Sequence, residues 1–225
     1  MKRLRRNKRA FTLAELVVAI AITALIASVV SVLVGSVIHI QRSAEITAQL
    51  ANVSQRLHTS LHSQLACVDK VKLFDKQANP SSILNSEYRY YIYVDSDRDK
   101  HLKLRSKSDS DPSEVLMHSD SYNGATIETF EVTVGAIEEK ASRDDSTPHV
   151  CYRILYIYTV LKKDGVEYEH VSTVRLYNMQ QYGNNIVVDG KTSEEMKTVV
   201  YNPETPLAKL PTYGIIAFGY EGGGS

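Results

Sequence analysis

The pattern of apolar and polar positions divides the chain into three stretches, and the first is the most apolar. Residues 16–38 form a run of 23 residues without a charged side chain. At about 1.5 Å per residue, a helix of this length is roughly 34 Å long, enough to cross a hydrocarbon core about 30 Å thick. The run is also longer than the roughly 7–15 apolar residues of a secretory signal. It predicts a retained membrane anchor.

The second stretch has the periodicity of an amphipathic helix. Its apolar side chains recur at steps of three and four: Ile46, Leu50, Val53, Leu57, Leu61, Leu65 and Val68. At about 100° per residue they cover an arc of roughly 120°. No proline interrupts residues 11–79. We therefore expect one helix from about Thr12 to Lys70, half in a membrane and half packed by its stripe against a folded domain.

The third stretch begins after residues 79–82, where the pattern changes to strand-like alternation. The expected strands cover residues 87–94, 101–107, 126–134, 149–161 and 166–178, with weaker signals at 185–188, 197–201 and 212–220. The third of these points Phe130, Val132 and Val134 to one side. Residues 162–165 form a hairpin turn, with Gly165 where a positive φ is needed. The expected fold class is α+β, a long N-terminal helix packed on an antiparallel sheet.

The chain length supports one ordinary domain with a stalk, and 225 residues hardly suffice for two full domains. The division that we expect is a basic leader at 1–10, a transmembrane and assembly segment at 11–40, an amphipathic stalk at 41–72, a sheet domain at 73–220 and a flexible tail at 221–225.

Charge is distributed unevenly, although the formal net charge is zero. Six basic residues lie within the first nine, and the rest of the chain has 20 basic against 26 acidic side chains. A mildly acidic body does not attract polyanions, so nucleic acid is not an expected partner. The basic cluster before the apolar run places the N-terminus in the cytoplasm and the sheet domain outside, by the positive-inside rule.

One carboxylate, Glu15, stands just inside the apolar stretch. A lone ionised carboxylate at depth costs about 2.5–3.5 kcal/mol on insertion scales and usually marks a function and a partner. With the basic leader, it completes the sequence RAFTLAELVVAIAITALIA at residues 9–27. This motif resembles the N-terminal signal of type IV pilins and type II secretion pseudopilins, in which a Gly-Phe-Thr-Leu-x-Glu sequence precedes about twenty apolar residues. The chain departs from that pattern at Ala10, where glycine is usual.

The resemblance implies a set of processing and assembly roles. Prepilin peptidase would cut between Ala10 and Phe11 and methylate the new amine of Phe11. Glu15 would then pair with the N-terminal amine of a neighbouring subunit. The implied partners are the peptidase, other pilin or pseudopilin subunits and membrane lipid. In size and in its stalk helix the chain is most similar to J-type pseudopilins and W-type minor pilins, so a minor subunit is expected rather than a major one.

Two polar clusters in the sheet domain offer alternatives. Asp95, Asp97 and Asp99 alternate as at the start of a calcium loop, but Lys100 and Ser106 stand where that loop needs glycine and glutamate. A solvated hairpin turn is the favoured interpretation. Lys103, Arg105 and Lys107 form a basic patch on one strand face. It could contact DNA phosphates, but protection of an edge strand explains it equally well and is favoured.

The cysteines and histidines give weaker signals. Cys67 and Cys151 lack zinc-site spacing, so in an exported domain a disulfide is favoured over two buried thiols. His58 and His62 have the i, i+4 spacing of helical metal ligands, but no third ligand is evident in the sequence, so a solvated helix flank is favoured. We expect no metal and no cofactor.

The functional prediction combines these features. No hydrolase, P-loop or dinucleotide-binding motif occurs, so an enzyme is not expected. We expect a minor pilin or pseudopilin subunit that assembles into a type IV pilus or a secretion pseudopilus. The alternative is a membrane-anchored adhesin or DNA-binding module, suggested by the 14 tyrosines and the basic patch. Nothing in the sequence distinguishes secretion, motility, DNA uptake and adhesion.

Overall fold

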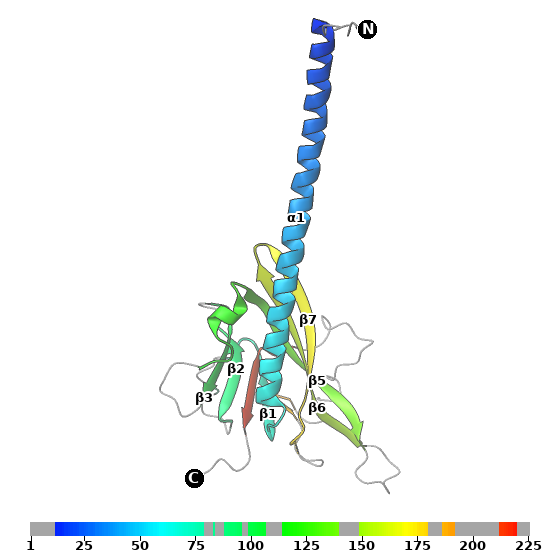
Figure 1. Cartoon of the computed structure of the whole chain (residues 1–225). Coiled ribbons are helices and arrows are strands. Elements are labelled where there is room, and N and C mark those ends of the chain that lie inside the picture. Colours follow the sequence, from blue (N-terminus) through cyan, green and yellow to red (C-terminus); the bar gives the residue numbers. More distant parts are fainter. Residues whose placement is uncertain are drawn as a thin grey trace, which may run out of the picture. The chain divides into compact units, whose positions relative to one another are not determined.

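The structure is a computed structural model that describes residues 12–78, 83, 88–95, 99–106, 114–139, 149–179, 186–191 and 212–219, with backbone only at 114–115, 136–139 and 149–151. The chain forms two compact units that divide between Glu45 and Ile46. Helix α1 (Leu13–Leu65) contributes to both units. Figure 1 shows its course along the chain.

Helix α1 confirms the predicted long helix, with an earlier end. Its outer-domain half buries the predicted stripe, from Ile46 to Leu65, in the second unit. The helix stops before Lys70 because Val68 N–H donates to the carbonyl of Leu65 and Asp69 N–H then pairs with Gly219. Lys70 is instead the first residue of a strand.

A six-stranded sheet carries the order β4-β3-β2-β9-β1-β8. Its strands are β1 (Lys70–Phe74), β2 (Tyr90–Val94), β3 (Leu102–Ser106), β4 (Glu114–Val115), β8 (Val187–Val188) and β9 (Ile215–Gly219). β8 pairs in parallel with β1 and the other pairings are antiparallel. The last described strand, β9, lies between β1 and β2, and all five of its residues are buried.

A three-stranded antiparallel sheet has the order β5-β6-β7. Its strands are β5 (Thr126–Glu139), β6 (His149–Lys163) and β7 (Val166–Arg175). The turn between β6 and β7 has positive φ at Asp164 (49°) and Gly165 (82°). These left-handed angles suit a two-residue hairpin turn and confirm the role predicted for Gly165.

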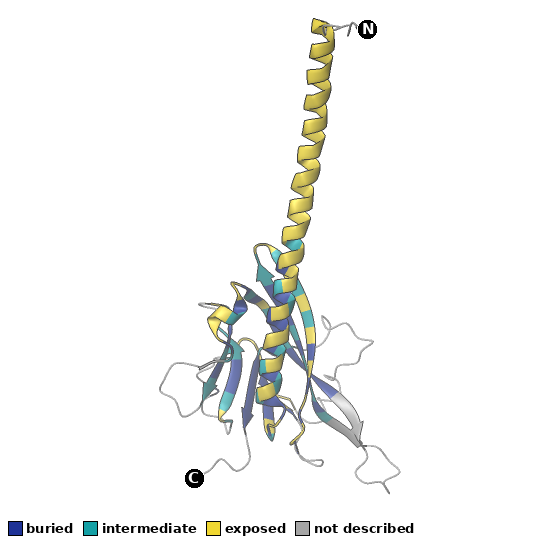
Figure 2. Cartoon of the chain, in the orientation of Figure 1, coloured by how far each residue is buried: buried dark blue, intermediate teal, exposed yellow. Residues whose placement is uncertain are grey.

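One hydrophobic core joins the stripe of α1 to the inner faces of both sheets. From the six-stranded sheet it includes Ile92 and Phe218, and from the other sheet Val132 and Leu155, all buried. Figure 2 shows the dark blue residues that form this core along the strands and the outer-domain half of α1. The predicted inward side chains Phe130, Val132 and Val134 are all part of it, because they alternate along β5.

Polar contacts add to this packing around a short 3₁₀-helix, η1 (Ser119–Tyr122). The hydroxyl of buried Tyr122 accepts a hydrogen bond from Leu102 N–H at 3.1 Å. Burial raises the pKa of Tyr122 to about 12, so the phenol stays protonated. Gln49 of α1 accepts hydrogen bonds from Asn123 (3.2 Å) and from Lys163 (2.7 Å). These contacts link the helix to η1 and to the β6–β7 turn.

The structure corrects the expected sheet in two respects. The α+β class holds, but the strands form two sheets, one of them mixed, instead of a single antiparallel sheet. The six-stranded sheet also has a second cluster of buried residues, formed by Phe74, Ile83, Tyr91, Ile215 and Ala217. The alternation of apolar and polar positions in the sequence had indicated only one apolar face for β2. The weak strand signal at 197–201 lies outside the described residues.

Candidate functional site

The N-terminal half of α1 is apolar around its whole circumference. Every large apolar side chain from Leu13 to Ile40 is at least half exposed, as the yellow ribbon of Figure 2 shows. In the described part of the chain this is one helix long and apolar enough to cross a membrane. A helix that is apolar on all sides must be covered by lipid or by other helices. It is compatible with a single-pass membrane anchor.

The hydroxyl groups of this segment are satisfied by the helix itself. Thr23 donates to the carbonyl of Ala19 at 2.8 Å, and Ser31 donates to that of Ala27 at 2.9 Å. Ser28 and Ser36 make the same kind of contact within one turn. Such bonding removes the need for water around the side chains. The segment is therefore suited to an environment without water.

Glu15 closes the first turn of α1 together with Thr12. One carboxylate oxygen, Oε2, accepts from the Thr12 N–H and from the Thr12 hydroxyl, both at 2.9 Å. In return, Glu15 N–H donates to Oγ1 of Thr12 at 3.3 Å. This reciprocal arrangement is a capping box, and the pattern Thr-x-x-Glu was its signal in the sequence. The carboxylate is exposed and held at the helix start. Ala10 and Phe11 lie outside the described residues.

The predicted basic patch is less available than the sequence suggested. Lys103 is only 12% exposed and forms an ion pair with Asp99 at 3.8 Å. Arg105 lies opposite Tyr91 on β2, and its Nε is buried. The edge-strand interpretation is wrong for β3, because β2 and β4 pair with it on either side. Lys107 lies outside the described residues.

The aspartate cluster occupies the β2–β3 turn. Asp95 N–H donates to the carbonyl of His101, and Lys100 N–H donates to that of Asp95, so backbone contacts close this turn. Asp97 lies outside the described residues. Within the described residues, no three side chains of His, Cys, Asp or Glu are grouped to hold a metal ion. The calcium alternative stays a prediction.

The cysteines and the histidine pair have different outcomes. Cys67 is an exposed, free cysteine, and the side chain of Cys151 is outside the described residues, so the disulfide stays a prediction. The rings of His58 and His62 lie 6.1 Å apart. Burial, followed by the charges of His62 and of His170 on β7, lowers the pKa of His58. Both helix histidines are half-buried instead of fully solvated, and sequence spacing gave no signal for the third.

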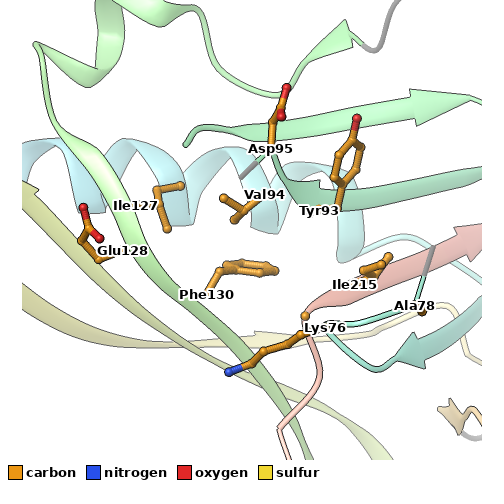
Figure 3. Close-up of a pocket in the computed structure, with 10 residues that line it drawn as sticks. Lys76, Ala78, Tyr93, Val94, Asp95, Ile127, Glu128, Phe130 and Ile215 are labelled. Carbon is orange, nitrogen blue, oxygen red and sulfur yellow. The ribbon is translucent and has the colours of Figure 1, made fainter. Parts of the chain in front are cut away.

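A cavity of about 330 Å³ lies where the six-stranded sheet approaches β5. Figure 3 shows Phe130, Ile127 and Val94 facing this space, with the carboxylates of Asp95 and Glu128 directed away from it. The hydrogen bond from Lys100 to Glu128, at 2.9 Å, lowers the pKa of that carboxyl. Among the described residues, those that line the cavity include no histidine, cysteine or serine.

Comparisons with known proteins agree with the N-terminal motif. A family model described as the prokaryotic N-terminal methylation motif matches residues 5–37. No curated protein matches the chain. The solved structure of the PilB minor pilin from Streptococcus sanguinis aligns with 79% of this chain and 34% of that chain, at 13% identity and a TM-score of 0.38. This chain thus aligns with about a third of the length of that protein, and a likeness this distant says nothing about function.

The matched region contains four of the six N-terminal basic residues, Ala10, Phe11, Glu15 and most of the apolar run. These are the features that distinguish a prepilin-type N-terminus from an ordinary signal anchor. The chain therefore carries a prokaryotic N-terminal methylation motif over residues 5–37 of its 225.

Proposed function

We propose that the chain is a minor pilin or pseudopilin subunit that assembles into a filament after removal of its leader. The observation that carries the proposal is the combination of an apolar N-terminal helix half, exposed on all sides, with Glu15 at its first turn. Prepilin peptidase cuts between Ala10 and Phe11 and methylates Phe11. The role of the subunit is structural and not catalytic.

The apolar helix supplies most of the stability of the assembled filament. In the membrane, lipid covers its side chains. In a filament, helices of neighbouring subunits replace the lipid. Full burial of a Leu, Ile or Val side chain away from water stabilises by about 1.5–3 kcal/mol. Once outside the lipid, this segment is therefore strongly favoured to remain against other helices.

Glu15 provides the register for this packing. The free amine of Phe11 in a neighbouring subunit supplies the counter-charge that the carboxylate lacks. Thr12 holds the carboxylate oxygen at the helix start until that partner arrives. Before the partner binds, the capping box lowers the free-energy cost of holding the carboxylate in an apolar environment, because a hydrogen-bonded carboxylate costs less there than one without hydrogen bonds.

Topology and domain roles follow from the same proposal. The N-terminus lies in the cytoplasm, residues 11–40 form the anchor, residues 41–72 the stalk, and residues 73–220 the extracytoplasmic domain. After assembly, the domain is at the cell surface or in the periplasm. The DNA-binding alternative has less support, because Lys103 is largely covered and paired with Asp99.

The test uses two substitutions at the helix start. Glu15→Gln keeps the shape and hydrogen bonding of the side chain but removes its charge, whereas Thr12→Val removes only the hydroxyl. In cells with an active pilus machine, we expect Glu15→Gln to insert and be processed normally but to be lost from sheared filaments. Thr12→Val is expected to retain most of its incorporation. Equal incorporation of Glu15→Gln and the wild type would refute the role of the charge.

A further inference from the structure

The cavity of about 330 Å³ between the six-stranded sheet and β5 has an apolar interior. Figure 3 shows that Val94, Ile127 and Phe130 face this interior from β2 and from β5. Binding pockets for small molecules have volumes of about 300–1,000 Å³, so this cavity is near the lower limit of that range. Its size suits one compact group, such as a single aromatic side chain.

Backbone polar groups of β5 face the cavity. Val132 N–H donates to the carbonyl of Tyr213 at 2.8 Å, and the carbonyl of Val132 accepts from Tyr213 N–H at 2.9 Å, so both groups point away from β6. In a regular strand, backbone groups two residues apart point to the same side, and no bulge lies between Phe130 and Val132. The N–H and C=O of Phe130 therefore point toward the cavity, and no residue of the described chain pairs with them there.

Strand β2 presents a second edge of this kind. Asp95 N–H donates to the carbonyl of His101, on the side of β3, so the N–H and C=O of the preceding Val94 point toward β9. The β2–β9 pairing ends before Val94, because Gly214, which would lie opposite, donates instead to the carbonyl of Phe74. The cavity thus combines an apolar interior with hydrogen-bonding groups at two strand edges. This combination suits a phenol better than a purely apolar group.

Tyr177 is an exposed phenol on a fixed backbone. Its side chain is 62% exposed, the highest value among the large apolar side chains described in the outer domain. Its N–H donates to the carbonyl of Ala66 at 2.8 Å, and the neighbouring Leu176 and Met179 are buried. A tyrosine presented in this way is a frequent anchor of protein interfaces, since little conformational entropy is lost when it binds.

The surroundings of Tyr177 and of the cavity differ in charge. The guanidinium of Arg175 lies over the ring of Tyr177, with Cζ 5.7 Å from the ring centroid. In Figure 3, the carboxylates near the cavity are directed away from its interior, so they lie at its rim. The charged groups around the cavity are three carboxylates and two ammonium groups, those of Asp95, Glu128, Glu131, Lys76 and Lys100. The net formal charge of the rim is therefore negative, which favours the approach of Arg175.

We propose that the cavity binds the side chain of Tyr177 from a second copy of this chain. Tyr177 does not line the cavity of its own copy. It is held at the end of α1, where Asp69 pairs with Gly219, whereas Ile215, which lines the cavity, lies about 13 Å away along β9. The contact therefore joins two different surfaces. Such a heterologous contact continues from copy to copy into a filament unless it closes into a ring. It needs no removal of the leader and so goes beyond the proposed function.

Site-specific cross-linking of the purified full chain in detergent micelles tests the contact. The photoreactive amino acid benzoylphenylalanine replaces Tyr177, and the cross-linked dimers are digested and analysed by mass spectrometry. We expect cross-links to residues 76–78, 93–95 and 127–130 of the second copy, with a yield that rises with protein concentration. The same cross-linker at Val187, which is 44% exposed on β8, should not label these residues.

Two variants separate the two sides of the contact. Ala78→Trp fills the cavity from its lining, and Tyr177→Ala removes the bound side chain. Each should reduce the capture of one tagged copy by another several-fold. A mixture of the two variants should associate again, because Tyr177 of the first copy enters the intact cavity of the second. Tyr177→Phe lacks the hydroxyl that bonds to the backbone at the cavity and should give an intermediate value.

Several results would overturn the proposal. These are the absence of cross-linked dimers at every concentration, cross-links from position 177 only to residues outside the cavity, and capture of both variants at the wild-type level. Failure of the mixture to associate, with both copies folded, would contradict a contact between two different surfaces. If Ala78→Trp does not fold, Val94→Trp fills the cavity from β2 and takes its place.

Discussion

The two halves of α1 have the same backbone but opposite side-chain environments. From Leu13 to Ile40, large apolar side chains are exposed on every side, whereas from Ile46 to Leu65 one stripe is buried and the rest is polar. The first half has no partner of its own within the described chain, and the second is part of the core. A helix thus shows by its pattern whether its partner is the same chain or something outside it. Paired substitutions, one in each environment, test this contrast.

The largest expected difference is between two leucines. Leu61 is fully buried and Leu25 is 66% exposed. Leu61→Ala leaves a cavity in the core and should lower the free energy of unfolding of the outer domain by about 2–5 kcal/mol. Leu25→Ala should leave it unchanged. Urea unfolding in detergent can be followed by tyrosine fluorescence, since the chain has no tryptophan. Similar losses for both variants would remove the distinction between the halves.

A second pair uses glycines. A Cβ added at Gly135 would fall on the ring of Tyr156 and lie 3.0 Å from Cβ of Ile154, whereas one added at Gly35 meets nothing within 4 Å. Gly135→Ala should therefore destabilise the outer domain by about 1–3 kcal/mol through overpacking. At Gly35, alanine should leave the domain unchanged and favour the helix by about 1 kcal/mol. Thermal unfolding measures the stability of the outer domain, and hydrogen exchange measures that of the helix. An unchanged stability of Gly135→Ala would contradict the close packing at β5.

A third pair compares hydroxyl groups. Tyr122→Phe leaves the buried N–H of Leu102 without its acceptor and should cost about 1–2 kcal/mol. Ser31→Ala removes a hydroxyl bonded only to its own helix, so the stability of the outer domain should not change. The change in the free energy of unfolding of each variant is obtained from its urea midpoint, provided that the dependence of this free energy on urea concentration stays the same. A measurable loss for Ser31→Ala would indicate that the N-terminal half supports the outer domain.

The smallest expected effect is on pH dependence. Burial lowers the pKa of His101, whose ring stacks on Tyr122 with centroids 3.8 Å apart. The unfolded chain binds the proton more readily, so unfolding becomes easier as the pH falls below about 6.5. His101→Phe keeps an aromatic ring there and should flatten this slope, whereas His39→Gln on the N-terminal half should not. Unfolding curves recorded between pH 7.5 and 5.0 measure how the free energy of unfolding changes with pH. The same pH dependence in the wild type and His101→Phe would contradict the role of His101.

Local patterns predicted much of the fold. The stripe from Ile46 to Leu65 and the hairpin around Gly165 follow from periodicity and turn chemistry, which act over a few residues. The position of β9 between β1 and β2 depends on pairing between distant segments, for which a single sequence has no signal. The short strand β4, at Glu114 and Val115, was missed for the same reason, so β3 was mistaken for an edge strand.

In the candidate site, too, the features that depend on local sequence could be predicted and those that depend on tertiary structure could not. Glu15 was evident because a charge within an apolar run is rare, and its contact with Thr12 could have been predicted from the capping pattern. The effect of the charge of His170 on the pKa of His58 could not be predicted, since the two residues are far apart in the sequence. The partial burial of Lys103 likewise depends on neighbouring strands, and a sequence patch cannot show it.

The central claim is that residues 1–10 are a leader whose removal creates the partner for Glu15. Mass spectrometry of the N-terminus, on protein extracted from the membrane of cells with an active prepilin peptidase, tests it most directly. The account predicts a chain that begins at Phe11 with one methyl group on its amine. A chain that still begins at Met1 in those cells would contradict it.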